Sequence, residues 1–545
     1  MAKESFIKGT LILAAAALIA RVLGVVQRVP LEHMLGVSGG AAFGLASNVY
    51  LMLLTFATAG IPSTLGKMVS EKYALNRPEE AQRIYFAAIL FGLGMGGLIT
   101  ALLYIFAPVY AEMSSVPEAT LAIRALAPAL ILFPVIAMMR GYFQGRNQMA
   151  PGGISQIIEQ ILRVITAVGL AYLFLTWGYS EEKMAAGASF GGVLGSIGAF
   201  LVMLYYARKL KKADREAGLA RNGQDKSVFM PLRQIYKDIF KLSIPIVITS
   251  LAVPIIYFID SSIIVPILKG QIGEPLAKEA LKVLTMNAQS IAGIPPILAI
   301  ALSTSIIPII SSAFARKEMD HLNKQVTLAL RIAILSGTPI VLILCTAAFS
   351  VNGLLFSSTN GSGIISLLTF CTIFQIVMMV SGSILFGLGR PKTPMFHVMI
   401  GIAVKLVGSF TLGYVFGIYG IVGSTMLCFA VTMYLNQRSL KQIVDFKILG
   451  SRWAGFLTTV IALAGIGYLI EWAGNQLTHV MHARIAYFIS SSLVGLVLIV
   501  LYPVMLVVFR VVTQQELSSY PRPLRKVFQP LMRLQRGQAV QSSDS

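Results

Sequence analysis

Charged residues are scarce in this chain: Lys, Arg, Asp and Glu make up 12% of its 545 residues, and hydrophobic residues make up 56%. Soluble globular proteins carry roughly 25% charged residues, so a water-soluble globular fold is excluded. Repeated apolar runs of about 20 residues indicate an all-α polytopic membrane protein. No alternating pattern favours a β-barrel, the other fold able to span a bilayer.

Catalytic and metal-binding patterns are also missing. The three cysteines lie within apolar runs, which argues against a disulfide framework and gives no metal-ligand spacing. The five histidines form no HExxH pattern and no P-loop occurs, so neither a metalloprotease nor an ATP-hydrolysing enzyme is indicated. We therefore expect that the chain is not an enzyme and holds neither a cofactor nor a metal.

Acidic residues are outnumbered by basic residues, 23 to 44, which gives a net charge of +21. Such an excess is typical of nucleic-acid-binding proteins, but the cytoplasmic loops of membrane proteins also collect Lys and Arg. With the N-terminus placed in the cytoplasm, 30 basic residues fall in inner segments, 6 in outer loops and 8 within spans. We therefore expect no nucleic-acid partner, and we expect both termini to face the cytoplasm.

The apolar runs predict about 14 transmembrane helices, each long enough to cross about 30 Å of hydrocarbon. Lys3 and Lys8 followed by an apolar stretch are typical of a signal peptide, but Arg21 interrupts that stretch and further spans follow, so we expect the first span to remain in place. The approximate limits are 7–27, 42–63, 84–107, 121–139, 152–176, 184–206, 239–268, 284–313, 325–354, 363–387, 395–416, 418–436, 453–473 and 485–511.

Two segments suggest an internal repeat: GYFQGRNQMAP (141–151) precedes the fifth span, and LFGLGRPKTP (385–394) precedes the eleventh. Both place a Gly-Arg pair in a short inner turn, although turn-rich loops also resemble one another by chance. A parallel repeat would give two pseudo-symmetric six-helix lobes plus two C-terminal helices. The predicted parts are an N-terminal lobe at 1–206, a basic cytoplasmic linker at 207–238, a C-terminal lobe at 239–436, two additional transmembrane helices within 453–511 and a basic cytoplasmic tail at 512–545.

Glu159 and Arg163 are charged residues in the apolar stretch that contains SQIIEQILRV (155–164). A charge at the bilayer centre costs about 2.5–3.5 kcal/mol or more. The two side chains are four residues apart, in the favourable order for an ion pair on one helix face. The pair is either a structural staple for the fifth span or part of a binding site.

The other charges inside the predicted spans favour a binding site. Arg21, Arg331 and Lys405 are further embedded cations. The only well-embedded acids that the sequence indicates are Glu159 and Asp260. A surplus of embedded positive charge is typical of a cavity for an anion. Asp260 is either the coupling site for H⁺ or Na⁺ or a structural partner of Arg21. The residues predicted to bind the anion in a central cationic cavity are Arg21, Glu159, Arg163 and Lys405.

Four segments carry a resemblance to a known group: IARVLGVVQRVPLEHMLG (19–36), AGIPSTLGKMVSEKYA (59–74), GYFQGRNQMAP with SQIIEQILRV, and FGLGRPKTPM (386–395). Together they resemble the polysaccharide-transport branch of the multidrug/oligosaccharidyl-lipid/polysaccharide (MOP) exporters, a superfamily that includes the MATE-like transporters. The likeness covers essentially all predicted spans and points to the SpoVB and YtgP types, with YtgP the better fit. These types are relatives of the MurJ lipid II flippases.

The resemblance implies two six-helix lobes around a central cavity, a groove for a lipid tail formed by the last two helices, and alternating access. It implies a flippase that moves undecaprenyl-pyrophosphate-linked peptidoglycan precursor (lipid II) from the inner to the outer leaflet of a bacterial plasma membrane. Its partners would be this lipid-linked anionic saccharide, membrane lipids and the cell-wall synthesis machinery. Membrane potential or an H⁺ or Na⁺ gradient would drive transport.

MurJ-type members carry a Ser-Arg-x-Leu-Gly-x-x-Arg-acid segment in the first span. Here Arg21 matches the first arginine, Gln27 stands where the second is expected, and Arg28 follows without the acid. The second span also lacks the arginine of those members, so Arg21 alone carries over. The alternatives are an exporter of another lipid-linked saccharide, a MATE-like drug or cation antiporter, which an acidic cavity would favour, and a glycan ligase, which would need catalytic residues on a sizeable outer loop.

Overall fold

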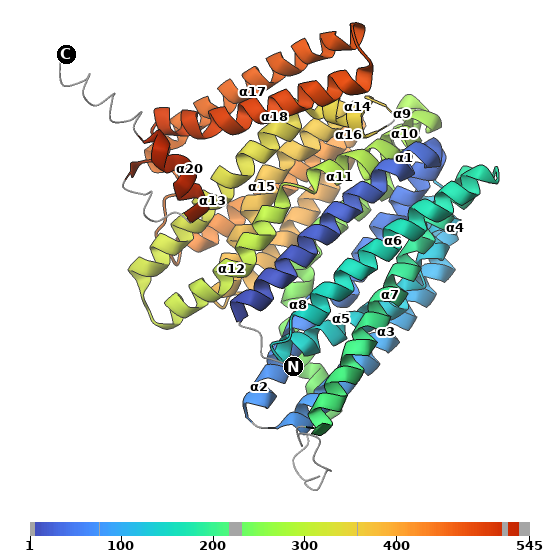
Figure 1. Cartoon of the computed structure of the whole chain (residues 1–545), viewed down its shortest axis with the longest axis vertical. Coiled ribbons are helices and arrows are strands. Elements are labelled where there is room, and N and C mark those ends of the chain that lie inside the picture. The colour runs from blue at the N-terminus through green and yellow to red at the C-terminus, as the bar shows by residue number, and fades with distance from the viewer. Residues whose placement is uncertain (1–5, 76, 217–230, 357, 515–521, 533–545) are drawn as a thin grey trace, which may run out of the picture. The chain divides into compact units, whose positions relative to one another are not determined.

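The computed structural model describes residues 6–75, 77–216, 231–356, 358–514 and 522–532 (Figure 1). Every regular element among these residues is a helix, which confirms the all-α class. The middle of the predicted linker at 207–238, most of the predicted tail at 512–545 and both chain ends lie outside the described residues.

The helices form two compact units. Unit 1 comprises Met1–Met286 and Gly413–Ile421, and unit 2 comprises Asn287–Leu412 and Val422–Ser545. The helices of unit 1 are α1 (Phe6–Thr58), α2 (Ile61–Ala74), α3 (Pro78–Met113), α4 (Ala119–Leu126), α5 (Ala129–Gly145), α6 (Ala150–Thr176), α7 (Glu181–Glu216), α8 (Leu232–Ser250), α9 (Ala252–Ile272) and α10 (Glu274–Lys282). Those that begin in unit 2 are α11 (Gln289–Ala292), α12 (Pro296–Ala315), α13 (Met319–Thr346), α14 (Ala348–Leu355), α15 (Ser362–Gly387), α16 (Lys392–Lys441), α17 (Trp453–Gln476), α18 (Ala483–Val508) and α20 (Arg522–Leu531).

The division between the units falls after the predicted lobe boundary. Helices α9 and α10 belong to unit 1 because they pack against α1. The boundary lies within a π-helical turn, Val283–Ala288, that follows α10. The lobe limits derived from the sequence, 1–206 and 239–436, stay a prediction.

Twelve helical segments among the described residues are long and apolar enough to cross a membrane. The two longest, Ala15–Ala74 and Lys392–Lys441, have 60 and 50 residues, or about 90 and 75 Å of helix, more than twice the hydrocarbon thickness. Gly36 (φ 67°) interrupts the first and Gly417 (φ 57°) the second, in a conformation that glycine adopts most easily. Each segment covers two predicted spans, and the count of 14 stays a prediction.

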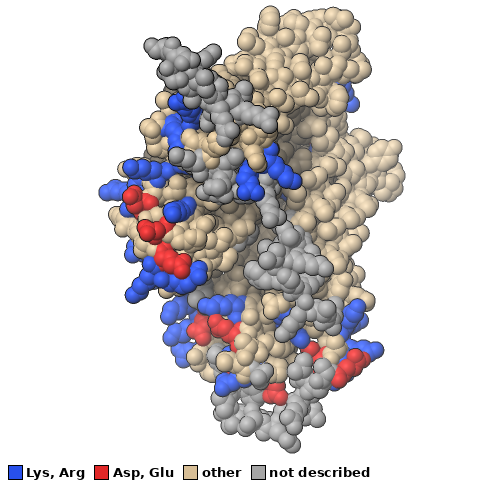
Figure 2. Space-filling view, turned by 60° about the vertical axis from the view of Figure 1, so that its left-hand side comes forward, with Lys and Arg blue, Asp and Glu red and all other residues tan. Residues whose placement is uncertain are grey.

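The outward faces of these helices are apolar. Ile105, Ile461 and Leu469 are 65%, 71% and 67% exposed, and large exposed apolar surfaces mark contact with a membrane or a partner. Figure 2 shows broad areas without any charged side chain, whereas Lys, Arg, Asp and Glu gather in separate parts of the surface. The chain is a multi-pass membrane protein.

Small residues hold α6 against its neighbours in unit 1. Helix α6 packs beside α1 and α7, as Figure 1 shows. A Cβ atom at Gly195 of α7 would lie 2.8 Å from the Glu159 carbonyl oxygen, and one at Gly191 would lie 2.8 Å from the Arg163 carbonyl oxygen. Small residues allow this close approach of membrane helices, and here they fix the charged face of α6.

The hairpins α5–α6 and α15–α16 share one turn geometry. A residue with positive φ follows the first helix of each, Asn147 at 58° and Gly389 at 72°. The next amide then bonds back to the carbonyl five residues earlier, at 2.9 and 3.0 Å, which is the Schellman arrangement. When the two turns are aligned by these bonds, Arg390 corresponds to Gln148. The Gly-Arg likeness in the sequence therefore matched Arg390 with Arg146, which is not its structural equivalent.

Candidate functional site

Glu159 lies at the centre of a three-charge cluster in unit 1. Its Oε1 accepts a hydrogen bond from Arg163 Nη2 at 3.2 Å, and its Oε2 accepts one from Arg140 Nη2 of α5 at 3.0 Å. Arg140 also donates through Nε to the Ser155 hydroxyl at 2.8 Å. The Glu159–Arg163 contact that the spacing indicates is present, and a second arginine shares the carboxylate.

The cluster is largely shielded and keeps a positive charge. The side chains of Glu159, Arg140 and Arg163 are 9%, 15% and 21% exposed. Two guanidinium groups share one carboxylate, so one unit of positive charge is left over. Sequence reasoning missed Arg140 because it follows the predicted end of the fourth span at 139, whereas α5 continues to Gly145.

Two polar groups at this cluster, which Tyr50 joins through its ring contact with Phe133, have no hydrogen-bond partner in normal geometry among the described residues. One is the hydroxyl of Tyr50 in α1, a residue that is 5% exposed, and the other is Nε of Arg163. The Arg163 guanidinium lies 5.7 Å from the centroid of the Phe133 ring, which stabilises it on that side. A buried donor without an acceptor costs about 1–3 kcal/mol. A positive site with two open donors is complementary to an anion.

Arg21 differs from the other embedded cations. Its side chain is exposed on α1, and no hydrogen bond or ion pair among the described residues involves it. Arg21 and the cluster around Glu159 both belong to unit 1, but no hydrogen bond or ion pair joins them in the described part of the chain.

Lys405 of α16 is fully buried in unit 2. Its Nζ donates to the Ser424 hydroxyl at 2.9 Å, and Ser424 and Ser409 share a hydrogen bond of 2.8 Å. The structure therefore brings Glu159 and Arg163 of the predicted set into direct contact, and it holds Lys405 among hydroxyl groups. The common cationic cavity for all four residues stays a prediction.

Asp260 and Arg331 are both buried. Asp260 of α9 is 1% exposed in unit 1, and its role in ion coupling stays a prediction. Arg331 of α13 is 8% exposed, and its Nε donates to the Ile448 carbonyl at 2.7 Å. Arg331 therefore contributes to packing within unit 2.

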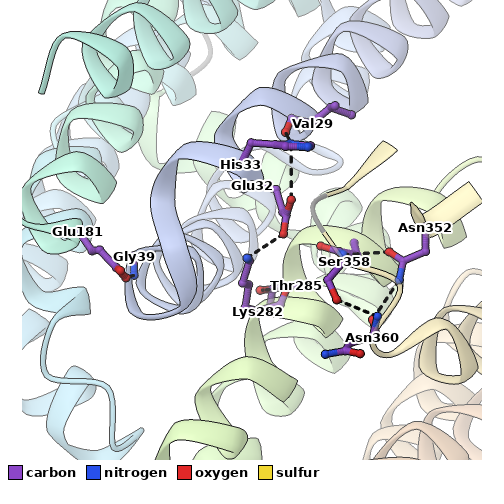
Figure 3. Close-up of polar contacts among 11 residues, drawn as sticks. Val29, Glu32, His33, Gly39, Glu181, Lys282, Thr285, Asn352, Ser358 and Asn360 are labelled. Carbon is purple, nitrogen blue, oxygen red and sulfur yellow. Dashed lines mark hydrogen bonds and ion pairs between the residues drawn. The ribbon is translucent and has the colours of Figure 1, made fainter. Parts of the chain in front are cut away.

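Three further acids are buried inside the protein: Glu32, which is 2% exposed, and Asp214 and Glu471, which are each 7% exposed. That Glu159 and Asp260 are the only well-embedded acids of the predicted spans stays a prediction. Glu32 Oε1 pairs with Lys282 Nζ at 2.7 Å (Figure 3). Sequence reasoning placed Glu32 in an outer loop, but α1 continues through that segment. The partner of Glu32, Lys282, is distant in the sequence, so no local spacing signals this ion pair.

Arg146 of the GYFQGRNQ turn is held by other protein groups. It donates to both carboxylate oxygens of Asp214 in α7, at 2.6 and 2.7 Å, and lies 4.7 Å from the centroid of the Tyr73 ring. Burial by itself lowers the pKa of Arg146, but the hydrogen bonds to Asp214 raise it above its usual value. This bidentate pair fastens the turn to α7.

Comparisons with known proteins agree with the helical architecture. The family model described as polysaccharide biosynthesis protein matches residues 6–314. Two proteins of Bacillus subtilis (strain 168) are similar over nearly their full length. Lipid II flippase MurJ is 25% identical over 91% of this chain and 94% of its own, and stage V sporulation protein B is 24% identical over 96% and 98%.

A solved structure of lipid II flippase MurJ in an inward closed conformation has the same fold. It aligns with a TM-score of 0.65 and 16% identity, over 92% of this chain and 98% of its own. The resemblance drawn from the four sequence segments is confirmed.

Proposed function

Because the chain belongs to the polysaccharide biosynthesis protein family, within the polysaccharide-transport branch of the MOP superfamily, we propose that it is a flippase for a lipid-linked saccharide. The substrate is the undecaprenyl-pyrophosphate-linked peptidoglycan precursor, lipid II, which it moves from the inner to the outer leaflet by alternating access. The similarity to a relative named lipid II flippase supports this substrate.

The observation that carries the proposal is the positive cluster around Glu159. Two arginines share one carboxylate, and the Tyr50 hydroxyl and Arg163 Nε lack acceptors among the described residues. A pyrophosphate supplies both the negative charge and the acceptor oxygens that such a site lacks. Glu159 then orients Arg163 and limits the positive charge of the empty site.

The chemistry of the substrate explains why such groups are needed. A pyrophosphate headgroup carrying sugars and a peptide cannot enter hydrocarbon unaided, because removing its hydration is too costly. Basic side chains and hydroxyls replace that hydration, while the polyprenyl tail stays in lipid. The exposed Arg21 on α1 provides a further cation for the headgroup.

The protein works in the bacterial plasma membrane, with both termini in the cytoplasm. The excess of Lys and Arg in the predicted inner segments supports this orientation. The enzymes of cell-wall synthesis are the partners that would receive the flipped precursor. The chemistry involves no covalent step, so the chain acts as a transporter and not as an enzyme.

A transport assay with fluorescent lipid II in proteoliposomes tests the proposal. Arg163→Gln is expected to abolish flipping, because it removes the charge and Nε together. Tyr50→Phe is expected to slow flipping about tenfold, the value of one hydrogen bond to a charged group. The matched control is Tyr172→Phe, which changes a residue that is 61% exposed on the same unit and is expected to have no effect.

Two results would overturn the proposal. One is a wild-type rate for both Arg163→Gln and Tyr50→Phe in protein of normal abundance and folding. The other comes from cells: depletion of the protein should cause lipid II to accumulate on the inner leaflet, and accumulation of a different lipid-linked saccharide would assign another substrate.

A further inference from the structure

Helix α20 packs together with two other segments of unit 2. It lies beside α18, as Figure 1 shows, and its residue Phe528 belongs to the same buried apolar core as Val511, which follows α18. The residues that lead into α17 join them, because Arg452 Nη1 donates a hydrogen bond to the Val511 carbonyl at 3.0 Å. Three segments that are distant in the sequence therefore meet at one end of unit 2.

The start of α17 and the end of α18 are in close contact. A Cβ atom at Gly455 of α17 would lie 2.7 Å from the carbonyl oxygen of Phe509, the C-cap of α18. In the segment before α17, Phe446 and Ile448 are buried in the core of unit 2, whereas Lys447 between them is exposed. The packing of the apolar residues therefore directs Lys447 outward.

Positive charge collects on the outside of these segments. Residues 442–453, 508–514 and 522–532 contain six basic residues and one acidic residue, Asp445. Four of the basic side chains are exposed and form no hydrogen bond or ion pair within the described part of the chain: Lys447, Arg510, Arg525 and Lys526. We call these four residues the basic patch. A concentration of one charge favours an anionic partner.

The basic patch lies where two membrane-spanning helices end. Helices α17 and α18 are both long and apolar enough to cross a membrane, and their sides expose residues such as Ile461 and Leu496. Trp453, the first residue of α17, is also exposed, and tryptophan is typical of the interface between lipid and water. The molecules next to the patch are therefore lipids, at the level of their headgroups.

The charge of an anionic phospholipid matches this surface. The headgroup of phosphatidylglycerol carries one negative charge, whereas that of phosphatidylcholine is neutral overall. Clusters of four or more Lys and Arg residues beside a transmembrane helix are typical of anionic-lipid binding. The opposite end of the helix pair, residues 474–484, has a single Lys or Arg residue, Arg484. We propose that the basic patch binds the headgroups of anionic phospholipids in the adjacent leaflet.

Fluorescence quenching by brominated lipids tests the patch, because the chain has three tryptophans, Trp177, Trp453 and Trp472. A protein with Trp177→Phe and Trp472→Phe keeps only Trp453 and is reconstituted in phosphatidylcholine vesicles. These contain a small share of either brominated phosphatidylglycerol or brominated phosphatidylcholine. Quenching of Trp453 is expected to show a preference of about tenfold for the anionic lipid. A protein that keeps only Trp472, nearer the other end of α17, is expected to show no preference.

Arg510→Gly in the protein with Trp453 alone removes one cation of the patch and keeps the backbone. Arg510 has a φ of 55°, a conformation that glycine adopts most easily. The preference for phosphatidylglycerol should fall about fivefold, the contribution of one cation near a membrane surface. Lys317→Gly is the matched control, because Lys317 is an exposed cation of unit 2 with a φ of 57° that follows α12. It precedes Glu318, so the charge in that turn is mixed, and the variant is expected to keep the full preference.

Replacing all four cations of the patch, by Lys447→Gln, Arg510→Gly, Arg525→Gln and Lys526→Gln, is expected to abolish the preference. The proposal is overturned if both brominated lipids quench Trp453 equally, because the patch would then serve an acidic partner other than a lipid. It is also overturned if Arg510→Gly and Lys317→Gly lower the preference equally, since the lipids would then respond only to the total charge of the protein.

Discussion

Arg163 of the α5–α6 hairpin and Lys405 of the α15–α16 hairpin occupy the same position in two similar structures. Each lies sixteen residues after the positive-φ residue of its turn, Asn147 in one hairpin and Gly389 in the other. In both hairpins the second helix begins three residues after the positive-φ residue, at Ala150 and at Lys392. A cation at this place is therefore common to the two units, although the surrounding side chains differ.

The difference lies four residues before each cation. Unit 1 has Glu159 there, which pairs with Arg163, whereas unit 2 has Gly401 and binds Lys405 through the Ser424 hydroxyl. Other buried charges follow the same division. Glu32 pairs with Lys282 in unit 1, while in unit 2 Arg331 donates to a backbone carbonyl and Glu471 accepts from neutral donors.

This comparison separates two ways of stabilising a buried charge. An opposite charge gives a strong interaction but leaves the partner uncompensated when one member is removed. Neutral hydrogen-bonding groups leave the net charge in place and lose less when they are removed. Mutations at equivalent positions of the two hairpins should therefore differ in cost.

The largest effect is expected for Glu159→Ala in unit 1. This variant leaves Arg140 and Arg163 facing each other without their shared carboxylate, and breaking a buried pair costs about 3–5 kcal/mol. We expect the lower end, about 3 kcal/mol of unfolding free energy in detergent, because the arginines are partly exposed. The double variant Arg140→Gln with Glu159→Gln imitates the neutral arrangement of unit 2 and should recover most of the loss. Equal stability of Glu159→Ala and the wild type would contradict the conclusion that unit 1 stabilises its buried charges by pairing opposite charges.

A smaller effect is expected for Lys405→Met in unit 2. The substitution removes a cation and its bond to Ser424 but keeps an unbranched apolar side chain in a fully buried position. The lost hydrogen bond and the gained apolar burial oppose each other, so we expect a loss of about 1 kcal/mol. The same unfolding measurement checks it, with Lys441→Met at the exposed end of α16 as the control. A loss as large as that of Glu159→Ala would show that both units depend equally on their buried charges.

The sequence was sufficient for the fold class and for the Glu159–Arg163 contact, because apolar runs and a spacing of four residues are local signals. Arg140 was not predictable, since its contact depends on how far α5 extends beyond the apolar run. The same contact means that a variant with Glu159 and Arg163 exchanged could not distinguish a structural role of the pair from a functional one. An arginine at 159 would face Arg140, so transport would fail whether the pair is structural or functional.

The exact alignment of the two hairpins could not be derived from the sequence either. An alignment of identical residues pairs the two Gly-Arg dipeptides with each other. The turn geometry, however, is set by Asn147 in one hairpin and by Gly389 in the other. Both residues tolerate positive φ, so the same backbone bend arises from different amino acids. The backbone of the two turns shows that Arg163 and Lys405 are equivalent.

The smallest effect is expected at an ion pair of unit 1 whose acid, Glu274, is exposed. Lys278 of α10 contacts Glu118 at 2.6 Å and Glu274 at 2.8 Å. The hydrogen bond from Lys278 lowers the pKa of Glu274. Burial by itself lowers the pKa of Lys278, but the bonds to Glu118 and Glu274 raise it above its usual value.

A carboxylate whose pKa is lowered in the folded state stabilises that state at pH values above its unfolded pKa of about 4.3. That contribution is lost as the pH falls through the lower folded value. We therefore expect Glu274→Gln to lower the melting temperature slightly near pH 7, and the difference from the wild type to shrink as the pH falls below about 4.3. Salt should reduce the difference near pH 7, because Glu274 is largely exposed and its interaction is screened. Melting curves of both proteins across this pH range provide the measurement, and a difference that persists at the acid end would mean that the glutamate acts through packing and not through its charge.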